Sequence, residues 1–208
     1  MNIIIIGATS GIGRALAKEM ASSGCTVGVT GRRLELLESL EQEIPSPCYK
    51  SQFDLSNVEQ SISAFNELIS AMGAVDAVVI NSGYGSIDNK LPLSNELQTI
   101  SVNVAGFTTI ANLAYKYFLE RGAGHIIGIS SVAAVRGGPF MSYNASKAYV
   151  SSYLEGLACR KECRSGAITI TDVRPGFVDT PMAQGEGLFW VASPETVSYT
   201  HLTLPTKA

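Results

Sequence analysis

Residues 1–13 read MNIIIIGATSGIG, a run of isoleucines that leads directly into a glycine-rich turn. A continuously apolar run of this length is typical of a strand buried on both faces. Glycines let the backbone turn tightly and approach a pyrophosphate, whose charge is met by the N-terminus of the following helix. The segment therefore predicts a strand, a dinucleotide-binding turn and a helix. The turn residues expected to bind the dinucleotide are Gly7, Thr9, Ser10, Gly11, Ile12 and Gly13.

Beyond this turn, short β-rich runs alternate with longer helical ones. The predicted strands are Asn2–Ile6, Thr26–Thr30, Cys48–Phe53, Ala77–Asn81, His125–Ser130 and Ile168–Arg174. The predicted helices are about Gly11–Ser23, Leu34–Glu43, Asn57–Met72, Glu96–Glu120, Tyr143–Arg164 and a weaker one from Ser193. Such alternation is typical of an α/β, Rossmann-like fold, a doubly wound parallel sheet with helices on both faces. We expect a single NAD(P)-binding catalytic domain over residues 1–196. A glycine-rich turn can be purely structural, but its place at the first strand–helix junction favours binding.

The composition narrows the class of protein. The 208 residues are 46% hydrophobic and 16% charged, which is the balance of one globular domain. A net charge of −3 provides no general basic field to attract nucleic acid or anionic lipid. No apolar run reaches the roughly 18 residues that a transmembrane helix needs. The first residues lack the basic region of a signal peptide, so a cytoplasmic location is expected.

Cysteine and histidine usage argues against two other kinds of site. The chain has four cysteines and two histidines, too few close together to predict a metal site. In a cytosolic protein these cysteines are expected to be free thiols. A Ser-His-Asp hydrolase is disfavoured because His125 would have to serve it alone.

The end of the second predicted strand bears on cofactor choice. An enzyme that prefers NAD usually places an acidic residue here, to accept hydrogen bonds from the adenosine ribose. This sequence has Arg32 and Arg33 instead, and a guanidinium can hold a 2′-phosphate by charge-assisted, bidentate hydrogen bonds. The alternative is that both arginines are solvated residues that open a helix. The pattern favours NADP(H) over NAD(H).

Tyr143 and Lys147 form the candidate catalytic pair. Positions i and i+4 share one face of a helix, so the phenol and the ammonium can point into one site. A free phenol has a pKa near 10, and a nearby cation favours the phenolate and lowers that pKa. Tyr143 could then exchange a proton with a carbonyl or alcohol oxygen. An isolated Tyr-x-x-x-Lys is otherwise common as a surface pair.

Taken together, the motifs resemble those of the short-chain dehydrogenase/reductase family, in its compact single-domain branch. The resemblance covers about residues 2–196 and rests on several motifs in the family's order. These are the glycine turn, Asp54-Leu55, Asn81-Ser82-Gly83, Asn103 in VNVAG (102–106), Ser130-Ser131, Tyr143-x-x-x-Lys147 and RPGFVDT (174–180).

The resemblance implies a catalytic set of Asn103, Ser131, Tyr143 and Lys147. Lys147 would also hold the nicotinamide ribose, and Asn103 would hold a water that links the lysine to solvent. A mid-helix residue with local hydrogen bonds is the alternative for Asn103. A positioned hydroxyl polarises a carbonyl. The family's Ser-Ser-Val-Ala stretch selects Ser131, whereas counting thirteen residues back from the tyrosine selects Ser130.

The resemblance also implies further cofactor contacts. Asp54 would lie at the adenine, although an aspartate before Leu-Ser could equally start a turn. Asn81 is expected to stabilise the central strands, and Thr180 would contact the nicotinamide amide. The full set of expected cofactor residues adds Arg32, Arg33, Asp54, Leu55, Asn81, Gly83, Lys147, Pro175, Gly176 and Thr180 to the turn.

These features predict an NADP(H)-dependent oxidoreductase that interconverts a carbonyl and an alcohol by hydride transfer. The small-molecule substrate would be an apolar ketone, aldehyde or 3-oxoacyl compound that meets Arg136–Ser142, the stretch after Gly83 and residues 181–190. A catalytically silent NAD(P)-binding regulatory protein of the same fold is the alternative. An epimerase or dehydratase usually needs a larger substrate domain. The resemblance implies a homo-dimer or homo-tetramer.

Residues 197–208 depart from the family pattern. Val197–Thr206 resembles the translation of a common transposon-type sequencing adapter, so we expect a non-native tail in place of the family's final helix and seventh strand. The loss would leave an apolar sheet edge at Ile168–Arg174. The Thr-Leu-Thr-Leu alternation could instead form a short strand.

Overall fold

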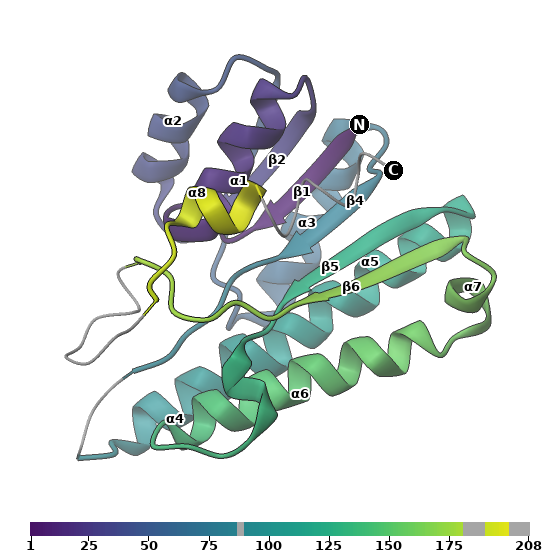
Figure 1. The fold of residues 1–208 in the computed structure, drawn as a ribbon. Helices are drawn as coiled ribbons and strands as arrows, with labels where there is room; N and C mark the ends of the chain where they lie inside the picture. Colours follow the sequence, from purple (N-terminus) through teal and green to yellow (C-terminus); the bar gives the residue numbers. More distant parts are fainter. Residues whose placement is uncertain (87–89, 181–189, 200–208) are drawn as a thin grey trace.

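The computed structural model describes residues 1–86, 90–180 and 190–199. Its core is a six-stranded parallel sheet with the strand order β3-β2-β1-β4-β5-β6 (Figure 1). The strands are β1 (Asn2–Ile6), β2 (Thr26–Gly31), β3 (Cys48–Gln52), β4 (Ala77–Ile80), β5 (Gly124–Ile129) and β6 (Ile168–Val173). From β1 the chain moves outward to β3, and it then returns to β4 on the other side of β1. This order confirms the predicted doubly wound Rossmann-like fold.

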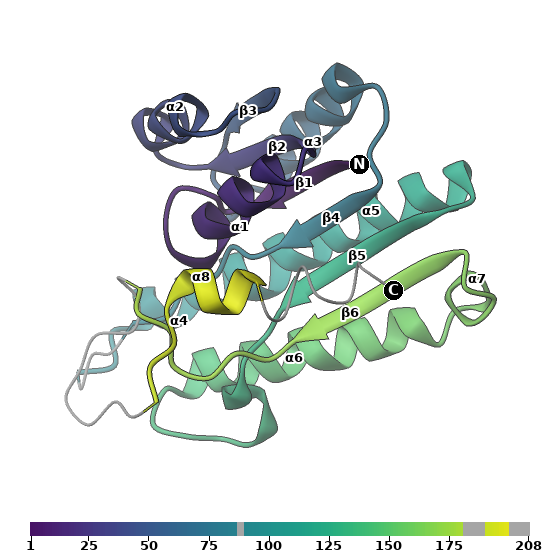
Figure 2. The ribbon, with the colours of Figure 1, turned by 45° about the horizontal axis from the view of Figure 1, so that its top comes forward.

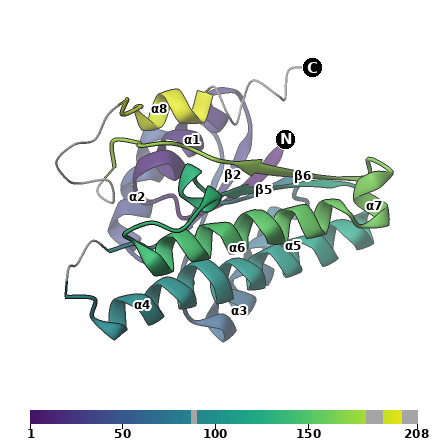
Figure 3. The same cartoon turned by 60° about the horizontal axis from the view of Figure 1, so that its bottom comes forward.

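Helices cover both faces of the sheet (Figures 2 and 3). One face carries α1 (Gly11–Ser22), α2 (Leu34–Glu43) and the short α8 (Pro194–Val197). The other carries α3 (Val58–Met72), α4 (Leu93–Ile100), η1 (Ser101–Gly106), α5 (Phe107–Arg121) and α6 (Met141–Ala158). Two short helices, η2 (Val132–Val135) and α7 (Lys161–Arg164), lie in the connections that follow β5 and α6. Within the described residues, no helix combines the length and the apolar character needed to cross a membrane.

The isoleucine run of β1 shows why a strand inside this sheet is apolar at every position. Successive side chains of a strand point to opposite faces. Ile4 and Ile6 pack in the core under α3, α5 and α6, whereas Ile3 and Ile5 pack against α1 and α2. All four are at most 2% exposed, so each contributes roughly 2 kcal/mol of apolar burial.

Two predicted helices differ from the structure. The helix predicted over Glu96–Glu120 begins earlier, at Leu93, and is interrupted by the π-helical segment η1 before α5. At the end of η1, Gly106 lies so close to Leu55 that an added Cβ would overlap the Leu55 carbonyl. The helix predicted over Tyr143–Arg164 ends at Ala158, because the backbone becomes extended at Arg160 before α7 begins.

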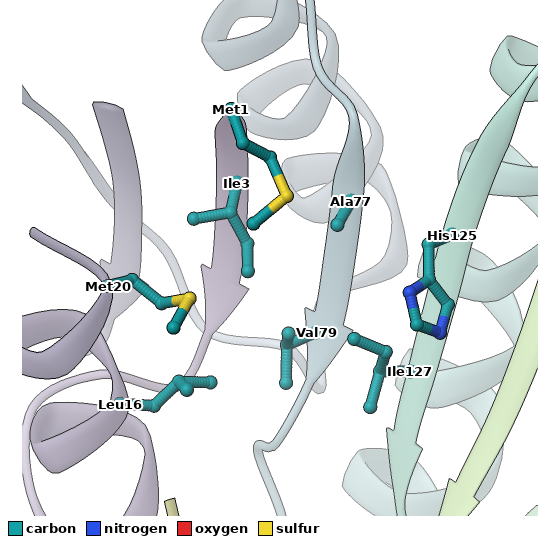
Figure 4. A pocket seen from close by; sticks show the side chains of 8 residues that line it. All are labelled: Met1, Ile3, Leu16, Met20, Ala77, Val79, His125 and Ile127. Carbon is teal, nitrogen blue, oxygen red and sulfur yellow. The ribbon is translucent and has the colours of Figure 1, made fainter. Parts of the chain in front are cut away.

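A small apolar pocket lies between α1 and the sheet (Figure 4). Its lining side chains come from α1, from β1, β4 and β5 and from the first residue: Met1, Ile3, Leu16, Met20, Ala77, Val79, His125 and Ile127. Burial lowers the pKa of His125, whose Nε2 lies 2.8 Å from the Thr171 hydroxyl. Because the pocket opens near the amino ends of these strands, it is separate from the glycine turn at their carboxyl ends.

Asp76 joins the amino ends of the central strands, and its contacts predict a pH dependence of stability. Burial raises the pKa of this carboxyl, but the Asn2 N–H at 2.7 Å and the Arg121 guanidinium at 2.6 Å lower it below the ordinary 3.8 in balance. The stabilisation is therefore complete above pH 3.8 and is lost as the pH falls through the lower, folded-state pKa.

We expect Asp76→Asn to lower the free energy of unfolding by about 1 kcal/mol at pH 7. The difference from the wild type should shrink as the pH falls below 3.8, which urea titrations at several pH values will measure. Glu120→Gln, on the exposed end of α5, is the control. A difference that does not change with pH would contradict this role for Asp76.

Candidate active site

The glycine turn sits where the connections after β1 and β4 diverge, the position at which doubly wound sheets bind ligands. Gly7 has φ +91°, a conformation that side chains rarely adopt. An added Cβ on Gly13 would overlap the Gly7 carbonyl, so this glycine lets α1 pack directly against the turn. The Asn81 amide donates to the same carbonyl at 2.8 Å. Asn81 thus ties the end of β4 to the turn.

Arg33 reaches across to the glycine turn. Its Nη2 lies 3.0 Å from the Thr9 hydroxyl and 3.3 Å from the Ser10 hydroxyl. Arg32 turns the other way, toward Asp54, with 3.9 Å between Nη1 and Oδ2. A guanidinium and two hydroxyls therefore converge at the carboxyl end of β2, and all three can donate to phosphate oxygens.

Asp54 and Leu55 have mainly local contacts. Asp54 Oδ1 accepts hydrogen bonds from the Ser56 N–H at 2.9 Å and the Ser56 hydroxyl at 2.8 Å, so this aspartate does start a turn. The Leu55 side chain lies in the core under α3 and α5. Any cofactor contact by Leu55 would come from its backbone.

Lys147 is buried between α6 and the ends of β5 and β6. Its Nζ donates to the Ile129 carbonyl at 2.8 Å. Burial lowers the pKa of Lys147 from 10.5 to about 8, while the negative charge of Asp172 opposes this shift. Gly83 lies in front of the ammonium, since an added Cβ there would be 3.4 Å from Nζ.

Tyr143 lies one turn before Lys147, with the lysine Nζ 5.7 Å from the centre of the phenol ring. Burial raises the pKa of the phenol above its ordinary 10, and a hydrogen bond from Ser131 partly lowers it. The sequence predicted that the cation would lower this pKa, and that direction is wrong, because the net shift is upward. The physical reason is that loss of hydration disfavours the phenolate more than nearby groups favour it.

The two adjacent serines point to different places. The Ser131 hydroxyl meets Tyr143, and it also accepts the Ala133 N–H at 3.1 Å at the start of η2. The Ser130 hydroxyl donates to Asp172 on β6. Of the two serines, Ser131 is the one whose hydroxyl lies beside the phenol.

Asn103 lies in the π-helical segment η1 and is 2% exposed. Its Oδ1 accepts the Tyr84 N–H at 2.7 Å, and its Nδ2 donates to the Tyr84 carbonyl at 2.8 Å and to the Ser146 hydroxyl at 2.9 Å. These contacts occupy the side-chain amide and attach the loop after β4 to α6. The π-helical interruption is the kind of local distortion often found at functional sites.

The segment after β6 also approaches the turn. The Pro175 carbonyl accepts the Val132 N–H at 3.0 Å, which holds this segment against η2. Thr180 lies beside Gly11, where an added Cβ would be 2.9 Å from its methyl carbon. Gly176 has open space around it. The predicted substrate residues Met182 and Phe189 lie outside the described residues.

Two polar residues of this region were missed by the sequence reasoning. Ser146 connects Asn103 to the Tyr143 carbonyl, to which it donates at 2.8 Å. Asp172 accepts hydrogen bonds near Lys147 from β5, α6 and β6. A signal for Asp172 did exist, since it is the only acidic residue of the predicted strand Ile168–Arg174.

A doubly wound sheet with a glycine turn and a Ser–Tyr–Lys cluster at one edge is the architecture of a nucleotide-dependent oxidoreductase. The short-chain dehydrogenase family model matches residues 1–188. An uncharacterized oxidoreductase of Myxococcus xanthus is 32% identical over 185 residues, covering 86% of this chain and 72% of that protein. The chain belongs to the short-chain dehydrogenase/reductase family.

Two further comparisons carry cofactor names. A probable NADP-dependent dehydrogenase of Haemophilus influenzae is 30% identical over 179 residues, covering 83% of this chain and 69% of that protein. The structure of a 3-ketoacyl-(acyl-carrier-protein) reductase from Brucella melitensis, complexed with NADH, superposes with a TM-score of 0.83. It is 24% identical, and the match covers 95% of this chain and 87% of that one. The likeness to this structure shows the fold alone.

The contacts of Asn103 predict a structural cost for its removal. Asn103→Ala leaves the buried Tyr84 backbone groups without partners, which should lower the free energy of unfolding by about 2 kcal/mol in urea titrations. Asn66→Ala, on the exposed side of α3, is the matched control. An Asn103→Ala protein as stable as this control would show that these hydrogen bonds do not hold the loop.

Proposed function

We propose that the protein interconverts a carbonyl and an alcohol with NADP(H), as a reductase of an apolar ketone, aldehyde or 3-oxoacyl compound. The observation that carries the proposal is the convergence of Ser131, Tyr143 and Lys147 at the end of β5 and the start of α6. A protein that only binds a nucleotide has no use for a half-buried phenol that shares a hydrogen bond with a serine.

The residues present fit the cofactor that the family uses. The glycine turn provides close backbone approach, and Arg33, Thr9 and Ser10 provide donors for phosphate oxygens. Lys147 would hold the nicotinamide ribose, with Asn81 and Thr180 fixing the walls of the site. When bound, the cofactor supplies or accepts the hydride.

Ser131, Tyr143 and Lys147 would each also act on the proton transfer. The high pKa of Tyr143 keeps the phenol protonated, so it can donate its proton to the carbonyl oxygen. The Ser131 hydroxyl donates to the same oxygen and stabilises the charge that develops there. The Lys147 ammonium favours the phenolate that remains. In oxidation the same groups act in reverse.

Arg33 and Arg32 support the preference for NADP(H). Arg33 already points to the turn that would hold the phosphates, whereas Arg32 is 62% exposed and lies 3.9 Å from Asp54. We propose that Arg33 binds the 2′-phosphate directly and that Arg32 adds a second positive charge. The relatives' names include both NADP and NADH, so the preference rests on these side chains.

The surroundings of the phenol support an apolar substrate. Tyr84 packs against the core cluster, and Phe140 and Met141 are 37% and 44% exposed beside Tyr143. These groups would bury an apolar or aromatic carbonyl compound. We also propose a cytoplasmic homo-oligomer, in which the exposed side chains of Leu93, Leu97 and Ile100 along α4 would be covered.

The cofactor proposal predicts unequal effects of two arginine substitutions. Arg33→Ala should raise the KM for NADPH by about 10-fold or more and leave the KM for NADH nearly unchanged, since only NADPH carries the 2′-phosphate. Arg32→Ala should have the same selectivity and a smaller effect. Steady-state kinetics with both cofactors test this. Equal effects on NADPH and NADH would refute the assignment.

The catalytic proposal predicts that substitutions of Tyr143 and Lys147 differ in their effect on NADPH binding. Tyr143→Phe should abolish carbonyl reduction while NADPH still binds in fluorescence titrations, because only the proton donor is removed. Lys147→Ala should impair both carbonyl reduction and NADPH binding, because the lysine is proposed to act on Tyr143 and to hold the nicotinamide ribose.

The two serines provide a matched pair. Ser131→Ala should lower kcat by about 100-fold, as expected for loss of a hydrogen-bond donor to developing charge. Ser130→Ala should have a much smaller effect, because its hydroxyl faces Asp172. The opposite ranking of the two serines would contradict the proposed geometry.

A further inference from the structure

Asp172 is an acidic residue in the interface between β6 and α6. Its side chain is only 14% exposed, whereas Ile168 and Ile170 on the same face of β6 pack in the core. A carboxylate in such a place is costly unless it is well hydrogen-bonded. The contacts of Asp172 therefore indicate what the residue does.

Three donors from three elements meet this carboxylate. Oδ1 accepts the Ser130 hydroxyl at the end of β5. Oδ2 accepts the Ser151 hydroxyl of α6 at 2.6 Å and Arg174 Nε, just after β6, at 2.6 Å. Ser130 is the neighbour of Ser131, and Ser151 lies one turn after Lys147. The carboxylate thus connects the two elements that carry the catalytic groups.

We propose that Asp172 is a positioning residue for the reaction, whose carboxylate keeps Lys147 charged and holds α6 in register with the end of β5. The inference rests on the proposed function. Among the described residues, Arg174, which follows β6, bonds to the carboxylate, and Glu155 lies 3.4 Å beyond it. Lys147 lies on α6 one turn before Ser151, and its Nζ bonds to the Ile129 carbonyl next to Ser130, so both serines that bond to Asp172 adjoin the lysine. At the end of β5 the carboxylate meets the Ser130 hydroxyl, which is uncharged. The side of Lys147 toward η1 and the loop after β4 holds the uncharged Asn103 and Gly83.

The electrostatic consequence follows from these charges. Burial favours loss of the Lys147 proton, and the Asp172 carboxylate favours its retention. Arg174, bonded to the same carboxylate, offsets part of that negative charge. Asp172 and Arg174 should therefore move the titration of Lys147 in opposite directions, which a purely structural clamp would not do.

The test measures the titration of Lys147 by ¹³Cε chemical shifts in lysine-labelled protein, with the signal assigned from Lys147→Arg. In Asp172→Asn the pKa of Lys147 should fall by about one pH unit, as expected for loss of a nearby opposite charge. In Arg174→Gln it should rise. Ser151→Ala removes one hydrogen bond and keeps the carboxylate, so the pKa should stay at its wild-type value.

A wild-type titration in Asp172→Asn would overturn the proposal even if that variant were less stable. Should Asp172→Asn fail to fold, Arg174→Gln decides, and an unchanged or lowered pKa there would overturn the proposal. Activity gives a second readout, since the charged form of Lys147 is lost as the pH rises through its pKa. The falling limb of the reduction rate should therefore move to lower pH in Asp172→Asn. A shifted titration in a protein that reduces no carbonyl compound would refute the proposed function and leave the coupling intact.

Discussion

The burial of the Lys147 ammonium is the constraint on which the site depends. A cation enclosed by protein needs partners, and here they are the Ile129 carbonyl at 2.8 Å and the negative charge of Asp172. Both partners come from the carboxyl ends of β5 and β6, so α6 must lie against these strands. That position also brings Tyr143 beside Ser131. The Ser131–Tyr143–Lys147 cluster therefore follows from the way α6 packs against the sheet.

The opposite half of the site depends on close backbone approach rather than on charge. Gly13 lets α1 meet the turn after β1, and the Asn81 amide fixes the Gly7 carbonyl from β4. Arg33 completes this half from the end of β2. The two halves meet between β1 and β4, which places the glycine turn and the Tyr143 phenol on the same edge of the sheet.

Much of this arrangement could be predicted from the sequence, because it follows from periodicity and motif order. The continuously apolar β1 and the glycine turn indicated a parallel sheet with the site at its carboxyl edge. The π-helical segment η1 could not be predicted, since the apolar period of the sequence does not distinguish it from an α-helix; the close packing of Gly106 against Leu55 at its end is a contact between segments far apart in the sequence. The sequence also could not predict that Arg33 points to the glycine turn while Arg32 points to Asp54, because this depends on side-chain direction. The predicted direction of the Tyr143 pKa shift was wrong, because a sequence shows a neighbouring cation more readily than it shows how far a phenol is buried.

The central claim is that the cofactor gives a hydride to the carbonyl carbon of the substrate while Tyr143 gives a proton to the carbonyl oxygen. The most direct measurement is a single turnover with NADPH that carries deuterium at both C4 positions and a panel of apolar ketones and aldehydes, followed by mass spectrometry of the product. The account predicts an alcohol that carries one deuterium on the carbon of the former carbonyl group. NADPH that binds but stays unoxidised across the panel, or an alcohol whose new carbon-bound hydrogen comes from water, would contradict it.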